Sequence, residues 1–189
     1  IGNMMTSSDV GIYFTAFKLS MITSIGLMSI NSIASPKFAE FYGDKNLEGL
    51  RKITYQSSKM IFWTTTPLIV CFLIFPKVLL GFFGEEFKIA AIAFIFLSIG
   101  KFISSLCGSV GNLLQMTGNQ FVFMKSLLFG AIINITLNFI LIPIYGINGA
   151  AIASMISLSS WNILMVYFVK RKLGFYSFYV PLLNKDYAE

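Results

Sequence analysis

Five long apolar segments constrain the fold of this chain more than any other feature of its sequence. They cover residues 10–35, 60–80, 89–115, 121–144 and 147–169. An α-helix needs about 20 mostly apolar residues to cross the hydrocarbon core of a bilayer. Only 12% of the 189 residues are charged, whereas roughly 25% are charged in a typical soluble domain. The sequence therefore predicts an all-α integral membrane protein with about five transmembrane helices.

Turn-forming residues separate these segments and predict where the helices end. Pro36 follows the first segment, and the stretch from Gly81 to Gly84 follows the second. Gly118 follows the third segment, and Pro143 and Gly146 lie at the end of the fourth. Pro67 lies inside the second segment, where we expect a kink and not a break because membrane helices can re-satisfy the freed carbonyl.

The connection from Lys37 to Lys59 mixes apolar and charged residues. Its apolar side chains recur near helical spacing: Phe38, Phe41, Tyr42, Leu50 and Ile53. This pattern predicts a short amphipathic helix that lies on the membrane surface. A plain solvated loop is the alternative.

The basic residues are distributed unequally between the two ends of the predicted helices. Ten of the 14 Lys and Arg residues fall on one side: Lys37, Lys45, Arg51, Lys52, Lys59, Lys125, Lys170, Arg171, Lys172 and Lys185. The opposite side carries only Lys77 and Lys88. By the positive-inside rule, the 37–59 connection and the 175–189 tail are expected in the cytoplasm, in a multi-pass protein of the cytoplasmic (inner) membrane. The net charge is +6, but the basic residues do not form a patch beside stacking aromatic residues in a polar domain. No nucleic-acid partner is therefore expected.

The chemistry that most membrane enzymes need is missing from the predicted spans. The chain has no histidine, and its acidic residues all lie outside the spans: Asp9, Glu40, Asp44, Glu48, Glu85, Glu86, Asp186 and Glu189. A protease or hydrolase would need paired carboxylates, a metal-ligand cluster or a base beside a nucleophile. Cys71 and Cys107 lie in apolar runs, which is typical of small buried side chains. We therefore expect no enzyme activity, no metal site and no cofactor.

Lysines inside the apolar segments are the main candidates for a binding site. Lys101 lies about 18 Å from the outer end of its segment at 1.5 Å per residue, and a mid-span lysine costs at least about 2.5 kcal/mol on insertion scales. We expect it to face water, an anion or a partner. Lys18, about 12 Å from the outer end of its segment, is a second candidate, although its amine could instead extend to the outer interface.

Amide side chains extend these candidates along two predicted helices. Asn112 and Gln115 follow Lys101 at steps of three and four, together with Ser104, Ser105, Gly108 and Gly111, which predicts one polar helix face along a hydrated path. In the next segment, Ser126, Gly130, Asn134 and Asn138 follow i+4 spacing. For Asn134 and Asn138, hydrogen bonding between helices is the favoured role. Lining a cavity is the alternative. Small residues at 146–154, including Gly149 and Ala153, predict close helix packing.

Three stretches occur in the order found in a known family. The first is Asp9-Val10-Gly11-Ile12-Tyr13 with Phe41-Tyr42-Gly43-Asp44 further on, and the second is Leu80-Gly81-Phe82-Phe83-Gly84-Glu85-Glu86-Phe87 with Leu113-Leu114-Gln115-Met116-Thr117-Gly118. The third is Leu141-Ile142-Pro143-Ile144-Tyr145-Gly146-Ile147-Asn148-Gly149-Ala150 and the residues to Ser154. Together they resemble the C-terminal lobe of polysaccharide flippases of the O-antigen or capsule type, in the multidrug/oligosaccharidyl-lipid/polysaccharide exporter superfamily.

The resemblance implies an architecture and a function. Residues 1–174 would form most of the C-terminal lobe of a two-lobe transporter of 12–14 helices, lacking the first helix of that lobe. Such a flippase moves undecaprenyl-pyrophosphate-linked oligosaccharides across the membrane by alternating access, with membrane lipids around it and a glycan polymerase or glycosyltransferases as further partners. The alternatives are a drug/cation antiporter of the same superfamily and a membrane enzyme of envelope glycan assembly. Lysines in spans without acids favour an anionic substrate, and the short outer loops argue against the enzyme.

Overall fold

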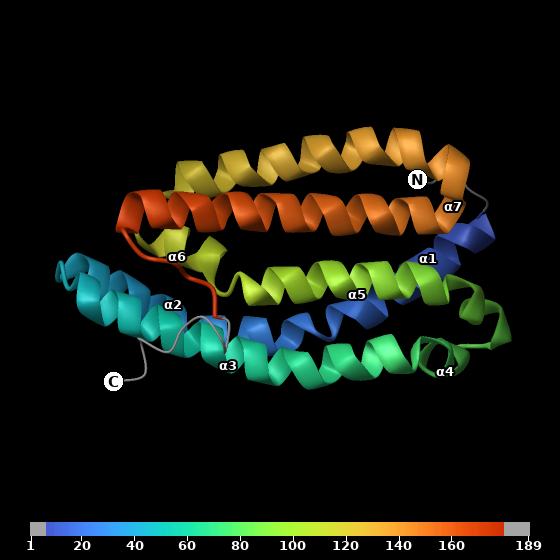
Figure 1. The fold of residues 1–189 in the computed structure, drawn as a ribbon, viewed down its shortest axis with the longest axis horizontal. Helices are drawn as coiled ribbons and strands as arrows, with labels where there is room; N and C mark the ends of the chain where they lie inside the picture. Colours follow the sequence, from blue (N-terminus) through green and yellow to red (C-terminus); the bar gives the residue numbers. More distant parts are fainter. Residues whose placement is uncertain (1–6, 180–189) are drawn as a thin grey trace.

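The computed structural model describes residues 7–179, and these residues form a bundle of roughly parallel and antiparallel helices (Figure 1). The helices are α1 (Ser7–Met21), α2 (Ser24–Gly43), α3 (Leu47–Ile74), α4 (Pro76–Gly81), the 3₁₀ helix η1 (Glu85–Ala90), α5 (Ala91–Leu106), α6 (Val110–Met116) and α7 (Gln120–Leu173). No strand occurs between residues 7 and 179. The predicted all-α fold is confirmed.

The first predicted span corresponds to two helices joined by a bend. The helix axes of Ser8–Met21 and Ser24–Gly43 differ by 45° across the break at Ile22 and Thr23. The sequence prediction that Pro36 ends the helix is wrong, because α2 continues through Pro36 to Gly43. A membrane helix tolerates the proline when neighbouring groups take up the freed carbonyl.

The predicted surface helix between Lys37 and Lys59 does not form. Instead, α2 turns directly into α3: Lys45 adopts φ 56°, and the Asn46 side chain caps α3 by accepting a hydrogen bond of 2.8 Å from the Gly49 amide. Phe38 and Leu50, which gave the segment its amphipathic pattern, are fully buried in one cluster between helices. Their apolar faces therefore cover a protein core and not the membrane surface.

The second predicted span, 60–80, corresponds to α3, which begins and ends earlier in the sequence, at Leu47 and Ile74. α3 passes through Pro67 without a break. Phe75 separates its last residue, Ile74, from Pro76, which occupies the first turn of α4. Proline disfavours a helical conformation in the residue before it, which explains the stop at Phe75. After α4, Gly84 with φ 133° leads into η1 and α5.

The third predicted span, 89–115, is interrupted. α5 ends at Leu106 and α6 begins at Val110, with Gly108 at φ 72° between them. The expectation of one continuous helix over this range is therefore wrong.

The fourth and fifth predicted spans form the two limbs of α7. Gly146 has non-helical angles (φ 53°, ψ −130°), and there the chain folds back so that residues 147–173 run beside residues 120–145 (Figure 1). Gly149 is buried, and a Cβ added to it would contact the Leu141 carbonyl group. Ala150, Ala151 and Ala153 are also buried, which confirms the prediction of close packing by small residues.

Three helices among the described residues are long and apolar enough to cross a membrane, and the bent pair α1–α2 makes a fourth candidate. They are α3, the η1–α5 segment and α7, the last of which contains two limbs. The chain is thus a multi-pass membrane protein.

Two apolar clusters fill the two ends of the bundle. One joins α1, α5 and the turn of α7 and includes Tyr13, Phe94 and Ile147. The other joins the α2–α3 connection, α6 and the C-terminal end of α7 and includes Phe38 and Val169. On α5 and on the second limb of α7, the polar residues considered below lie between the residues of these clusters.

The predicted tail, 175–189, begins as part of the bundle. Phe175, Ser177 and Tyr179 are buried. Residues 180–189, like residues 1–6 of the predicted lobe, lie outside the described part of the chain.

Candidate functional site

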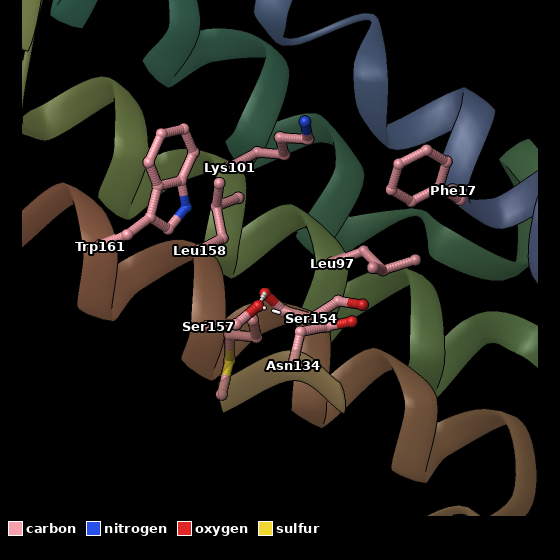
Figure 2. Close-up of a pocket in the computed structure, with 9 residues that line it drawn as sticks. Phe17, Leu97, Lys101, Asn134, Ser154, Ser157, Leu158 and Trp161 are labelled. Atoms are coloured by element: carbon pink, nitrogen blue, oxygen red, sulfur yellow. Dashed lines mark hydrogen bonds between the residues drawn. The ribbon is translucent and has the colours of Figure 1, made fainter. Parts of the chain in front are cut away.

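A pocket of about 290 Å³ lies between α1, α5 and both limbs of α7 (Figure 2). The residues that line it combine one cation, amide and hydroxyl groups, and aromatic rings: Phe17, Leu97, Lys101, Asn134, Ser154, Met155, Ser157, Leu158 and Trp161. None of them is a carboxylate. The two apolar clusters flank the pocket along α5 and α7, which places it away from both ends of the bundle.

Lys101 supplies the positive charge of this pocket. Its side chain extends from α5, and its Nζ lies 5.8 Å from the centroid of the Phe17 ring on α1. An aromatic face within about 6 Å attracts a cation weakly. Lys101 forms no salt bridge with the carboxylates among residues 7–179. The structure thus places Lys101, which the sequence predicted to face water, an anion or a partner, in the wall of this pocket.

A chain of neutral hydrogen bonds crosses the pocket wall. Asn138 Nδ2 donates to Asn134 Oδ1 (2.9 Å), and Asn134 Nδ2 donates to Ser157 Oγ (3.1 Å). Ser157 Oγ in turn donates to the Ser154 carbonyl (3.2 Å), and the Ser154 and Tyr13 hydroxyls lie 3.0 Å apart. These bonds join α1 and the two limbs of α7, as the sequence favoured for the amides, while Asn134 also lines the pocket. Asn138 does not line it.

Lys18 lies outside the pocket. Its side chain is exposed, and its Nζ sits 4.6 Å from the centroid of the Phe14 ring one turn earlier on α1. Elsewhere in this part of the chain, Ser20 on α1, Thr23 at the bend and Asn31 on α2 are buried.

Asn112 and Gln115 are separated from Lys101 by the break between α5 and α6. Asn112 Nδ2 donates a hydrogen bond of 2.7 Å to Ser35 Oγ and thereby ties α6 to α2. Gln115 is exposed, and its Nε2 donates to the Gly111 carbonyl (3.3 Å). The prediction of one polar face from Lys101 to Gln115 is wrong, because it assumed a continuous helix.

The aromatic rings of the pocket were not predicted from the sequence. Trp161 approaches the first limb of α7 closely because Gly130 lies opposite: a Cβ on Gly130 would stand 3.0 Å from Trp161 Cβ. Phe17 reaches the pocket from α1. The one available signal was Gly130, which the i+4 pattern identified as a packing position without showing its partner.

The pocket can bind a polar or anionic group but offers no chemistry for bond cleavage. It contains a cation, amide groups and hydroxyls, and no group of His, Cys, Asp or Glu suited to a metal ion occurs among residues 7–179. The Lys101 amine, in a pocket wall without carboxylates, favours a ligand that carries negative charge.

Comparison with known proteins places the chain in a family. Residues 1–140 match the model of the MatE family. The chain is 26% identical over 170 residues to the probable low-salt glycan biosynthesis flippase Agl15 of Haloferax volcanii, covering 89% of this chain and 36% of that protein. It is 28% identical over 158 residues to an uncharacterized membrane protein, MJ1068, of Methanocaldococcus jannaschii, covering 80% of this chain and 30% of that protein.

The chain thus spans about a third of the length of the curated relatives it matches. No solved structure gives a significant match. Because the family model covers most of the sequence, the chain belongs to the MatE family.

Proposed function

We propose that the protein containing this chain is a flippase, not an enzyme, that translocates a lipid-linked oligosaccharide across the cytoplasmic membrane. The observation that carries the proposal is Lys101, a lysine inside a membrane-spanning helix whose pocket contains no carboxylate. The similarity to a probable glycan flippase supports the same substrate class. The sequence resemblance favours an undecaprenyl-pyrophosphate carrier, and glycosyltransferases would supply the substrate.

The charge of the pocket selects among the transport substrates considered. A cationic drug would meet the Lys101 amine with no acid on the pocket wall to compensate it. A phosphate or pyrophosphate group would instead satisfy an amine whose burial in a span otherwise costs about 2.5–3.5 kcal/mol. The neutral amide and hydroxyl groups of Asn134, Ser154 and Ser157 can hydrogen-bond the oxygens of the same ligand.

The size of the pocket limits which part of the substrate it can hold. Its volume of about 290 Å³ is at the lower end of the range for small-molecule sites, roughly 300–1,000 Å³. This accommodates the phosphate end of the substrate better than a complete oligosaccharide. The sugars would lie against parts of the full-length protein beyond this chain, and the lipid would stay in the bilayer.

Orientation in the membrane is a further part of the proposal. The turn at Asp44 and Lys45 would face the cytoplasm, and the α7 turn at Tyr145 would face outward, because basic residues concentrate at the former end. Both turns are exposed, so Asp44→Cys and Tyr145→Cys variants provide matched probes. In intact cells a membrane-impermeant maleimide should label position 145 and spare position 44. The reverse pattern would contradict the orientation.

Substitution of Lys101 tests the proposed function. Flipping of a labelled lipid-linked oligosaccharide is measured in vesicles with the full-length protein and its Lys101→Arg, Lys101→Gln and Lys101→Glu variants. Charge-assisted hydrogen bonds contribute about 1.5–3 kcal/mol, so Gln should slow flipping about tenfold to a hundredfold. Arg should retain most activity, and Glu should abolish it.

Lys18→Gln is the matched control, since Lys18 is an exposed lysine that does not line the pocket. It should affect flipping less than Lys101→Gln, with equal amounts of protein in the membrane. Equal flipping by the Arg, Gln and Glu variants would remove Lys101 from the substrate path. Efflux of a cationic dye that increases in Lys101→Glu would favour the antiporter instead.

A further inference from the structure

The segment that follows α7 turns back onto the bundle. Gly174 ends the helix with φ 85°, and its amide bonds the Lys170 carbonyl. The chain then descends from the end of α7 toward α3 (Figure 1). Within this segment, Phe175, Ser177 and Tyr179 are 7%, 1% and 7% exposed, whereas Tyr176 is 52% exposed. The alternation shows that residues 175–179 present one side to the protein interior.

The inner side of the segment binds α3. Ser58 Oγ donates a hydrogen bond of 2.6 Å to the Ser177 carbonyl. The Tyr179 ring packs edge-on against two rings of α3, with centroids 5.4 Å from Tyr55 and 5.5 Å from Phe62. A buried hydrogen bond and an aromatic cluster therefore hold the segment on this helix.

The same segment also binds the break between α5 and α6. Ser177 Oγ donates to the Cys107 carbonyl (3.2 Å), a group that the helix leaves available where α5 ends. At Gly108, a Cβ would stand 3.0 Å from the Ser177 carbonyl oxygen, and it would also collide with Ser58. Ser177 therefore contacts α3 through its carbonyl and the break through its hydroxyl.

This arrangement connects a segment outside the helices to a point where a helix can bend. Residues 175–179 belong to no helix, and Ser177 donates one hydrogen bond and accepts another that join them to the rest of the bundle. Segments near the end of a helix can open locally at less than the free energy of global unfolding. A break in a helix at a glycine is a typical position for a change of helix direction.

We propose that residues 174–179 form a releasable strap that closes the α5–α6 break against α3, and that release of the strap lets this break bend during transport. The transport step rests on the proposed function, whereas closure of the break does not. Lys101 lies on α5, so bending at the break would move α6 relative to the pocket.

Cys107 is a natural reporter of strap release, because it is only 6% exposed and lies beneath the strap. The experiment uses the full-length protein with the substitution Cys71→Ser, which removes the exposed cysteine of this chain. N-ethylmaleimide modification of Cys107 is then followed by peptide mass spectrometry. Tyr179→Ala should raise the labelling rate at least about tenfold, because it removes the contacts with both α3 rings. Ser58→Ala should raise the rate by a smaller factor, about threefold or more.

Tyr167→Ala is the matched control, since it removes a tyrosine ring from the surface of α7, where it is 56% exposed. It should leave Cys107 labelling unchanged. If Tyr179→Ala and Ser58→Ala label no faster than Tyr167→Ala, residues 174–179 do not close the break and the strap is overturned.

Flipping by the same variants tests the second half of the proposal. Tyr179→Ala and Ser58→Ala should change the flipping rate at least about twofold, while Tyr167→Ala should not. Fast labelling with an unchanged flipping rate would contradict a role for strap release in transport. If the wild-type protein flips no lipid-linked oligosaccharide, the proposed function fails, and the labelling result still decides whether the strap exists.

Discussion

Two glycines interrupt the long helices of this bundle, and their surroundings differ completely. Gly146 (φ 53°) turns α7 back on itself, and a Cβ added there would meet nothing within 4 Å. Gly108 (φ 72°) separates α5 from α6, and a Cβ added there would meet Ser58 and the Ser177 carbonyl. The turn at Gly146 is thus specified by its own backbone, whereas the break at Gly108 is also fixed by packing from two other segments.

The difference shows which features of this membrane protein are local. At Gly146, Pro143 and Tyr145 are exposed beside the turn, and the proline and the glycine themselves favour a reversal of the chain. At Gly108, the neighbours Cys107 and Ser109 are both buried, and no proline or charge marks the site. A helix break of the second kind depends on residues distant in sequence, such as Ser58 and Ser177.

The strongest test of this comparison is Gly108→Ala. Positive φ costs a non-glycine residue about 1–3 kcal/mol, and overpacking against Ser58 and the Ser177 carbonyl should add about 1–3 kcal/mol. Together these costs predict a loss of about 2–6 kcal/mol in the free energy of unfolding. Reversible denaturation of the full-length protein in mixed micelles, followed by circular dichroism, measures it.

Gly118→Ala is the control for this variant. Gly118 has the same φ of 72°, but a Cβ on it would meet nothing within 4 Å. The difference between the two variants isolates the packing contribution at Gly108. Equal losses in both would show that packing from α3 and the strap does not fix the break.

Sequence patterns predicted the parts of the fold that depend on local chemistry. The apolar segments identified the membrane-spanning helices, and the small residues at 146–154 identified the close packing of the α7 limbs. The break at Gly108 was missed because its cause is a tertiary contact, and the end of α2 was misplaced because Pro36 is tolerated inside a packed helix. Phe38 and Leu50 predicted a surface helix because amphipathic spacing does not reveal whether lipid or protein covers the apolar side.

The distinction between local features and features that depend on tertiary contacts also applies to the candidate site. Lys101 could be identified from the sequence because a charge inside an apolar segment is costly wherever the helix packs. Asn112 and Gln115 could not be assigned correctly, since their relation to Lys101 required an unbroken helix. Trp161 and Phe17 were missed because aromatic residues are common in membrane helices, and only the fold brings these two to one pocket.

The smallest expected effect belongs to Gly146→Ala. The backbone at Gly146 (φ 53°, ψ −130°) lies in a region that residues with a Cβ rarely adopt, which costs about 1–3 kcal/mol. Alanine also restricts the unfolded chain, which offsets about 0.4–1 kcal/mol of that cost. No packing term is added, because the Cβ would meet open space. The net loss should be about 1–2 kcal/mol, clearly below that of Gly108→Ala, in the same denaturation experiment.

Tyr145→Ala, at the exposed neighbouring position, should change the stability by less than about 0.5 kcal/mol. A loss at Gly146 as large as that at Gly108 would mean that another part of the full-length protein packs on this turn, and the distinction between a local and a tertiary break would then fail.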